Sequence, residues 1–257
     1  MGTDDTFALL LVKAATLAVV GVAGGFINTV AGGASLLCMP VLAWLGLPAN
    51  AANATNNLAT TAQSLFSAAS FARRGFRDLR LVAILALPAV AGAVLGSWFV
   101  VELPERAFSR IVGLLMLGTL VLVLKKPRPK GRTERPPLRR GAAVGGVALF
   151  GVLGIYGGFF GGGLGLMMLP LLVLLFDLDL VTGNSVKTAL SFVMNLTATF
   201  VFVAHGLVHL AYAIPLTAGM LVGARLGVTM SIAGGDAWIR RFLVVITLVA
   251  AAWFLLR

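Results

Sequence analysis

A cluster of amide and hydroxyl side chains opens one apolar segment in the first half of the chain. Its members are Asn53, Thr55, Asn56 and Asn57, in the sequence ANATNNL, with Gln63 about two helical turns further along. Amides are costly in hydrocarbon unless they are hydrogen-bonded. Helix capping and hydrogen bonds between helices would account for such a cluster, and so would contacts to a polar substrate. Four polar residues exceed what capping needs, which favours the substrate.

A second cluster, GNSVKTA at residues 183–189, opens a segment in the other half. Its candidate residues are Asn184, Ser185, Lys187 and Thr188, with Asn195 about two turns later. A lysine inside a membrane helix is expensive and faces a cavity or a partner group. The alternative for Lys187 is that its side chain extends to the membrane interface. If it faces a cavity, its charge suits an anion.

Glycines interrupt the apolar pattern in each half about 20 residues before the polar cluster, at Gly32 and Gly33 and again at Gly162 and Gly163, flanked by Gly161 and Gly165. Glycine breaks serve close helix packing. They also free backbone N–H groups, and the N-terminus of a helix carries partial positive charge that attracts anions. We predict that both pairs of glycines face a bound anion.

The elements that position these residues are membrane helices. The 257 residues are 59% hydrophobic and 11% charged, with a mean hydropathy of +1.00, whereas soluble domains are about 25% charged. Continuous apolar runs favour helices over a β-barrel. The expected fold is an all-α integral membrane protein with about eight to ten transmembrane or half-membrane helices. The runs are 7–31, 34–47, 50–72, 80–101, 107–124, 141–161, 164–176, 181–204, 207–233 and 238–256.

The chain divides into two repeated halves, residues 1–124 and 141–257, joined by a basic linker at 125–140. Residues 24–40 read GGFINTVAGGASLLCMP and residues 157–170 read GGFFGGGLGLMMLP. Further on, each half has a proline followed by two glycines at the same spacing. The matching residues are Pro88, Gly92 and Gly96 in one half and Pro215, Gly219 and Gly223 in the other.

The charges predict that the repeat is inverted. Eight lysines and arginines in the linker place it in the cytoplasm, as do the arginines between 73 and 80. The loop that corresponds to 73–80 in the second half, 205–211, has no lysine or arginine. Corresponding loops on opposite sides of the membrane are typical of inverted repeats, which have broken or short helices at the repeat interface.

Several other functions lack the residues they need. GNSVKT resembles part of a phosphate-binding loop, but Val186 stands where glycine must precede the lysine. We expect no enzyme activity and no catalytic residues, because no Ser/His/Asp or paired-carboxylate pattern occurs. His205 and His209 lack acidic or cysteine partners, so we expect no metal site and no cofactor. The net charge of +11 reflects membrane topology, not nucleic-acid binding.

These motifs together resemble the TauE/SafE sulfite exporter family, also called TSUP. The similarity rests on the two glycine-rich segments, on the polar ANATNNL and GNSVKTA segments, and on the proline-glycine helices. It implies a transporter of a bacterial or archaeal inner membrane, with duplicated halves. It implies small anionic substrates such as sulfite or sulfonates, moved by secondary transport linked to protons.

The sequence therefore predicts a multi-pass secondary transporter of a small oxyanion, working by alternating access with the substrate between the halves. A passive anion channel is the alternative, and a membrane enzyme or assembly factor is a weaker one. The expected partners are the small anion and the lipid bilayer, and a homo-oligomer is compatible with the sequence.

Overall fold

A computed structural model describes residues 3–112, 114–115 and 140–255, with side chains over the inner part of these ranges. The described residues form helices and no strand, which confirms the all-α prediction. The helices with assigned bounds are α1 (Thr3–Val30), α2 (Ala34–Trp44), α3 (Ala49–Arg73), α4 (Leu79–Glu102), α6 (Arg140–Phe159), α7 (Leu164–Phe176), α8 (Leu180–Ala204) and α9 (Leu210–Leu255). Residues 105–112 are also helical, and residues 116–124 of the run predicted at 107–124 lie outside the described residues. The linker predicted at 125–140 lies outside the described residues except for its last residue.

Most of the apolar runs predicted from the sequence match a helix to within a few residues. The sequence predicts separate helices at 207–233 and 238–256, and α9 consists of two helical stretches that meet at a kink without a loop between them. Its helical backbone is interrupted at Gly235, where φ is 59° and ψ is −161°. Only glycine adopts this conformation readily, so the chain changes direction there without a loop.

Four described helices are long and apolar enough to cross a membrane: Leu9–Val30, Leu79–Glu102, Leu180–Ala204 and Leu210–Phe242. Helices α2 and α7 have 11 and 13 residues, so each is about 17–20 Å long. A bilayer core is about 30 Å thick, and neither helix spans it alone. Helix α3 has 25 residues but is polar at its start, and it packs against α8 and α9 inside the bundle.

The two proline-glycine helices, α4 and α9, each pack against the helix that precedes the glycine break in the opposite half. Helix α9 lies along α1, and α4 lies along α6. At each contact a glycine approaches a backbone carbonyl so closely that a Cβ would overlap it. The pairs are Gly219 with Ala18, Gly223 with Val22, Gly92 with Gly151, and Gly96 with Ile155. Glycine allows this approach because it has no side chain.

Replacing Gly223 with valine is therefore expected to destabilise the bundle. A Cβ there would overlap the Val22 carbonyl oxygen, and such overpacking costs about 1–3 kcal/mol. The measurement is the thermal unfolding midpoint of purified protein in detergent. Gly145→Val is the control, because a Cβ at Gly145 has no atom within 4 Å. Equal midpoints for the two variants would contradict this account of the α1–α9 contact.

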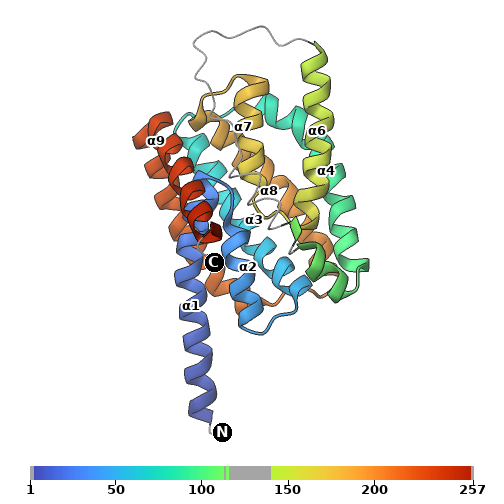
Figure 1. Cartoon of the computed structure of the whole chain (residues 1–257), viewed down its shortest axis with the longest axis vertical. Coiled ribbons are helices and arrows are strands. Elements are labelled where there is room, and N and C mark those ends of the chain that lie inside the picture. Colours follow the sequence, from blue (N-terminus) through green and yellow to red (C-terminus); the bar gives the residue numbers. More distant parts are fainter. Residues whose placement is uncertain (1–2, 113, 116–139, 256–257) are drawn as a thin grey trace.

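We propose that the two halves are an inverted repeat, with α1, α2, α3 and α4 equivalent to α6, α7, α8 and α9. The contacts support this, because exchanging the halves turns the α1–α9 pair into the α6–α4 pair. Figure 1 supports it too: α1 rises from the N-terminus at the bottom of the view, while α6 runs downward from the top. Helix α2 lies in the lower part of the bundle and α7 in the upper part.

The two main apolar cores follow the same correspondence. One core joins α1, α2, α3 and α9, and the other joins α6, α7, α8 and α4. Helix α2 contributes Ala34, Cys38 and Leu42 to the first, and α7 contributes Leu164, Met168 and Leu172 to the second. Each member of one set lies 130 residues from its counterpart, which is the register that aligns Pro40 with Pro170. Each of the two short helices, α2 and α7, thus packs in the core of its own half.

Candidate functional site

The breaks of the two halves meet in the interior of the bundle. The N–H of Gly165, in the first turn of α7, donates a hydrogen bond to the carbonyl oxygen of Gly32 at 3.2 Å. Gly32 has a φ of 85°, in the left-handed region, and a Cβ on it would overlap the Gly165 backbone. Glycine is therefore needed at Gly32 for its backbone conformation and for the contact.

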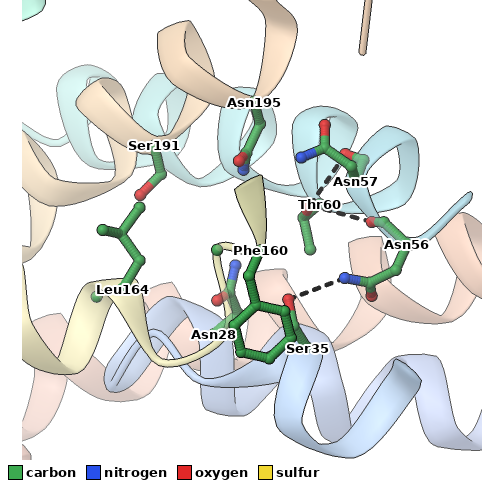
Figure 2. A pocket seen from close by; sticks show the side chains of 11 residues that line it. Asn28, Ser35, Asn56, Asn57, Thr60, Phe160, Leu164, Ser191 and Asn195 are labelled. Atoms are coloured by element: carbon green, nitrogen blue, oxygen red, sulfur yellow. Dashed lines mark hydrogen bonds between the residues drawn. The ribbon is translucent and has the colours of Figure 1, made fainter. Parts of the chain in front are cut away.

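A small pocket lies where the breaks meet, between helices of both halves (Figure 2). Its lining residues are Asn28, Ser35, Asn56, Asn57, Thr60, Phe160, Gly161, Leu164, Gly165, Ser191 and Asn195. The cavity has a volume of about 20 Å³, roughly the room of one water molecule. Seven of these eleven residues have amide or hydroxyl side chains, and none has a charged one.

Four of the polar side chains have a hydroxyl or NH₂ group that donates no hydrogen bond to a described residue, and the Oδ1 atom of Asn56 is an acceptor without a described partner. Ser191 and Asn195, one helical turn apart on α8, form no hydrogen bond with any described residue. The Oδ1 atom of Asn57 accepts a hydrogen bond from Thr199 at 2.8 Å, which leaves its NH₂ group free. Ser35 accepts from Asn56 at 2.9 Å, so its hydroxyl hydrogen is available. These groups come from α2, α3 and α8.

Three of the residues predicted from sequence line this pocket: Asn56, Asn57 and Asn195. The others are buried elsewhere and are engaged in hydrogen bonds or backbone turns within the fold. They are Asn53, Thr55, Gln63, Gly32, Gly33, Gly162, Gly163, Asn184, Ser185, Lys187 and Thr188.

Asn53 and Asn184 each donate a hydrogen bond to the C-terminal end of a helix that precedes a glycine break. The amide of Asn53 donates to the carbonyl of Phe159, at the end of α6, at 3.0 Å. The amide of Asn184 donates to the carbonyl of Val30, at the end of α1, at 3.2 Å. The last carbonyls of a helix lack partners within it. Each asparagine therefore satisfies one of them from the opposite half of the chain.

The remaining polar residues also bond to the protein. Thr55 accepts from the N–H of His209 at 3.1 Å, and Ser185 donates to the carbonyl of Phe76. Thr188 donates to the carbonyl of Ser185, one turn back on α8. Gln63 joins α3 to α1 through Asn28 and Thr29, and it also donates to Ser67, one turn further along α3. Burial of these side chains is explained by their partners inside the bundle.

The two helix N-termini at the breaks are not equivalent. At α7 the N–H groups of Leu164, Gly165 and Leu166 already donate to the carbonyls of Gly161, Gly32 and Gly163. At α2 the N–H groups of Ala34 and Ser35 have no partner among the described residues. The pocket contains Ser35, so α2 is the helix whose N-terminus is available to a ligand there.

Lys187 is 1% exposed, and its ammonium does not line the pocket. It donates to the carbonyl oxygens of Asn28 at 3.1 Å and Thr29 at 2.9 Å, in the last turn of α1. Asp179 does not pair with it; its carboxylate caps α8 by accepting from Thr182 N–H at 2.8 Å. Lys187 thus lies behind the pocket wall, on the C-terminal end of a helix, where cations are favoured.

Two further lining residues, Gly161 and Gly165, belong to the glycine break that the sequence shows in the second half. Sequence reasoning missed the other six: Asn28, Ser35, Thr60, Phe160, Leu164 and Ser191. Two of these six carried a signal. Ser191 precedes Asn195 by four residues, which places both on one face of a helix. Asn28 is an amide inside an apolar run. The other four become pocket residues through contacts between the halves.

Apolar helices that break around a buried polar pocket, with half-length helices beside it, are an arrangement found in many membrane transporters. The sequence matches the family described as Sulfite exporter TauE/SafE over residues 17–254, and the chain belongs to this family. It is a membrane transporter and not an enzyme.

Known relatives span the same length. The chain is 27% identical over 238 residues to a probable membrane transporter protein of Haemophilus influenzae, covering 93% of this chain and 92% of that one. It is 28% identical over 248 residues to the probable membrane transporter protein ORF9 of Sinorhizobium sp, covering 96% and 93%. It is 28% identical over 238 residues to the probable membrane transporter protein YfcA of Escherichia coli, covering 91% and 86%. No solved structure shows significant similarity to the chain.

Proposed function

We propose that this protein is a multi-pass secondary transporter of small sulfur-containing oxyanions, such as sulfite or sulfoacetate, in the cytoplasmic membrane of its cell. The observation that carries the proposal is the set of unused hydrogen-bond donors around the pocket: Ser35, Asn57, Ser191 and Asn195. Each presents a hydroxyl or amide group to the cavity, and such neutral donors suit the oxygen atoms of a small anion.

The chemistry of the lining supports an anion that is bound and then released. Hydrogen bonds from neutral donors to a charged acceptor contribute about 1.5–3 kcal/mol each, and the α2 N-terminus adds partial positive charge. A lysine or arginine in direct contact would bind the anion more tightly and slow its release. Donors from α2 and α3 in one half and α8 in the other fit a substrate held between two halves that move past each other.

The test is uptake into proteoliposomes that contain the purified protein. The labelled anions are sulfite, sulfoacetate, thiosulfate, sulfate and acetate, each with and without an imposed pH gradient. We expect saturable uptake of a sulfur oxyanion, and exchange of internal for external anion without a gradient. Unsaturable flux with conductance would indicate a passive channel. Absence of exchange for every anion, with folded protein, would refute the proposal.

A Thr199→Val variant is expected to bind the anion about fivefold more weakly. The Thr199 hydroxyl fixes the Asn57 amide with its NH₂ group toward the pocket, and such a hydrogen bond contributes about 1 kcal/mol. The measurement is the concentration for half-maximal exchange. Thr197→Val is the matched control, because Thr197 bonds to Val193 on its own helix. Equal shifts in the two variants would contradict this role for Thr199.

A further inference from the structure

The hydrogen bonds of Lys187 are sufficient for a neutral amine but not for an ammonium ion. Its Nζ atom has two acceptors, the carbonyl oxygens of Asn28 and Thr29. A neutral lysine amine has two N–H donors and can keep both bonds. An ammonium ion has three donors, and the third has no acceptor among the described residues. Both backbone contacts are kept in either protonation state, but only the neutral amine has an acceptor for every N–H.

No charged group of the described residues compensates a positive charge at Lys187. Helices α1, α3, α4, α6, α7 and α9 all pack near or against α8. Most of their charged side chains lie at helix ends or on exposed surfaces: Lys13, Arg73, Arg80, Glu102, Arg225, Arg240 and Arg241. Asp236 on α9 accepts from the N–H of Leu180, the first residue of α8, and forms no ion pair with Lys187, whose Nζ atom donates, among the described residues, only to Asn28 and Thr29. Asp179 caps α8 at its exposed end, and Tyr156 on α6 donates to the carbonyl of Gly162. A buried charge without a partner is strongly disfavoured.

The pocket is the nearest place where a compensating negative charge can lie. Asn28 and Gly165 both line it. The carbonyl of Asn28 accepts from the Lys187 ammonium, and a Cβ on Gly165 would contact the Lys187 side chain at 3.1 Å. One layer of backbone thus separates the lysine from a bound anion. At this depth in the bundle, charges attract each other far more strongly than they do in water.

We propose that Lys187 carries the proton that couples anion transport to the proton gradient. This inference rests on the proposed function of the pocket. When an anion enters, the lone pair of the Lys187 Nζ atom takes up a proton from water, so that positive charge accompanies negative charge. When the anion leaves on the other side, the N–H bond breaks and the proton follows it. The empty protein returns with a neutral lysine.

The first experiment measures proton uptake by the wild-type protein. Sulfoacetate is added to purified protein in weakly buffered detergent near neutral pH, where this anion carries no titratable proton. Binding linked to protonation removes about one proton from solution per anion bound. A pH-sensitive dye reports the uptake, and calorimetry gives the amount of anion bound. Binding without proton uptake would overturn the proposal directly, with no variant involved.

The second experiment separates coupling from transport. Lys187→Arg keeps a permanent positive charge, so we expect it to exchange sulfoacetate across proteoliposomes at a rate within about threefold of wild type. It should nevertheless fail to accumulate sulfoacetate in response to a pH gradient. Lys13→Met is the matched control. Lys13 is also a part-buried lysine, but it lies in the N-terminal half of α1, and its ammonium contacts Leu45 and Tyr212 and no pocket residue. This control should keep both exchange and gradient-driven accumulation.

The two hypotheses fail in different ways. Gradient-driven accumulation by Lys187→Arg at the wild-type level would overturn the role of Lys187 and leave the proposed function intact. Absence of sulfoacetate exchange in the wild type, with folded protein, would overturn the proposed function for this anion and this inference with it. Loss of accumulation in Lys13→Met as well as in Lys187→Arg would show that the loss is not specific to Lys187, and it would overturn the assignment of coupling to this residue.

Discussion

An Asn195→Asp variant is expected to lose anion transport almost completely while the protein stays folded. Asparagine and aspartate have the same shape, and Asn195 forms no hydrogen bond with a described residue, so the substitution removes no internal contact. It replaces an NH₂ donor in the pocket with a negative charge. Loss of a hydrogen bond to a charged ligand costs about 1.5–3 kcal/mol, or about 10–100-fold in affinity, and charge repulsion adds to it.

The measurement is the rate and half-saturation of anion exchange in proteoliposomes. Asn50→Asp is the control, because Asn50 accepts a hydrogen bond from Ala51 N–H at the start of α3, where a carboxylate is favoured. That variant should transport as the wild type does. If Asn195→Asp exchanged anions normally, or took up cations in their place, the pocket would not be an anion site.

A Gly32→Ala variant is expected to lose the pocket itself. Gly32 has a φ of 85°, and its Cβ would overlap the Gly165 backbone. The left-handed conformation costs a non-glycine residue about 1–2 kcal/mol, and overpacking adds about 1–3 kcal/mol. Moving the two breaks apart would also break the Gly165–Gly32 hydrogen bond. We expect a lower thermal unfolding midpoint and no measurable anion exchange.

Variants at Gly33 and Gly46 distinguish the two causes of this loss, the left-handed backbone conformation and the contact with Gly165. Gly33→Ala should be tolerated, because its φ is −137° and the nearest atom to a Cβ lies 3.6 Å away. Gly46→Ala should show the conformational cost alone, because its φ is 103° and no atom lies within 4 Å of a Cβ. If Gly33→Ala inactivated the protein as fully as Gly32→Ala does, contact between the breaks would not explain the requirement for glycine.

The sequence determined the class of protein and most of its helices. Long apolar runs with few charges form helices in a membrane, because the backbone must satisfy its own hydrogen bonds there. Glycines placed the breaks correctly between α1 and α2 and between α6 and α7. The cost of burying amides also drew attention to α3 and α8, the helices that supply Asn56, Asn57 and Asn195 to the pocket.

The tertiary structure decided which of the buried polar residues face the pocket and which hold the fold. Asn53 and Asn57 lie one turn apart on the same helix, yet Asn53 caps α6 while Asn57 lines the pocket. Lys187 finds its acceptors 159 and 158 residues away in sequence, on α1. A sequence shows that a polar group in hydrocarbon needs a partner. Which partner it has depends on how the two halves pack together, and periodicity within one helix carries no information about that.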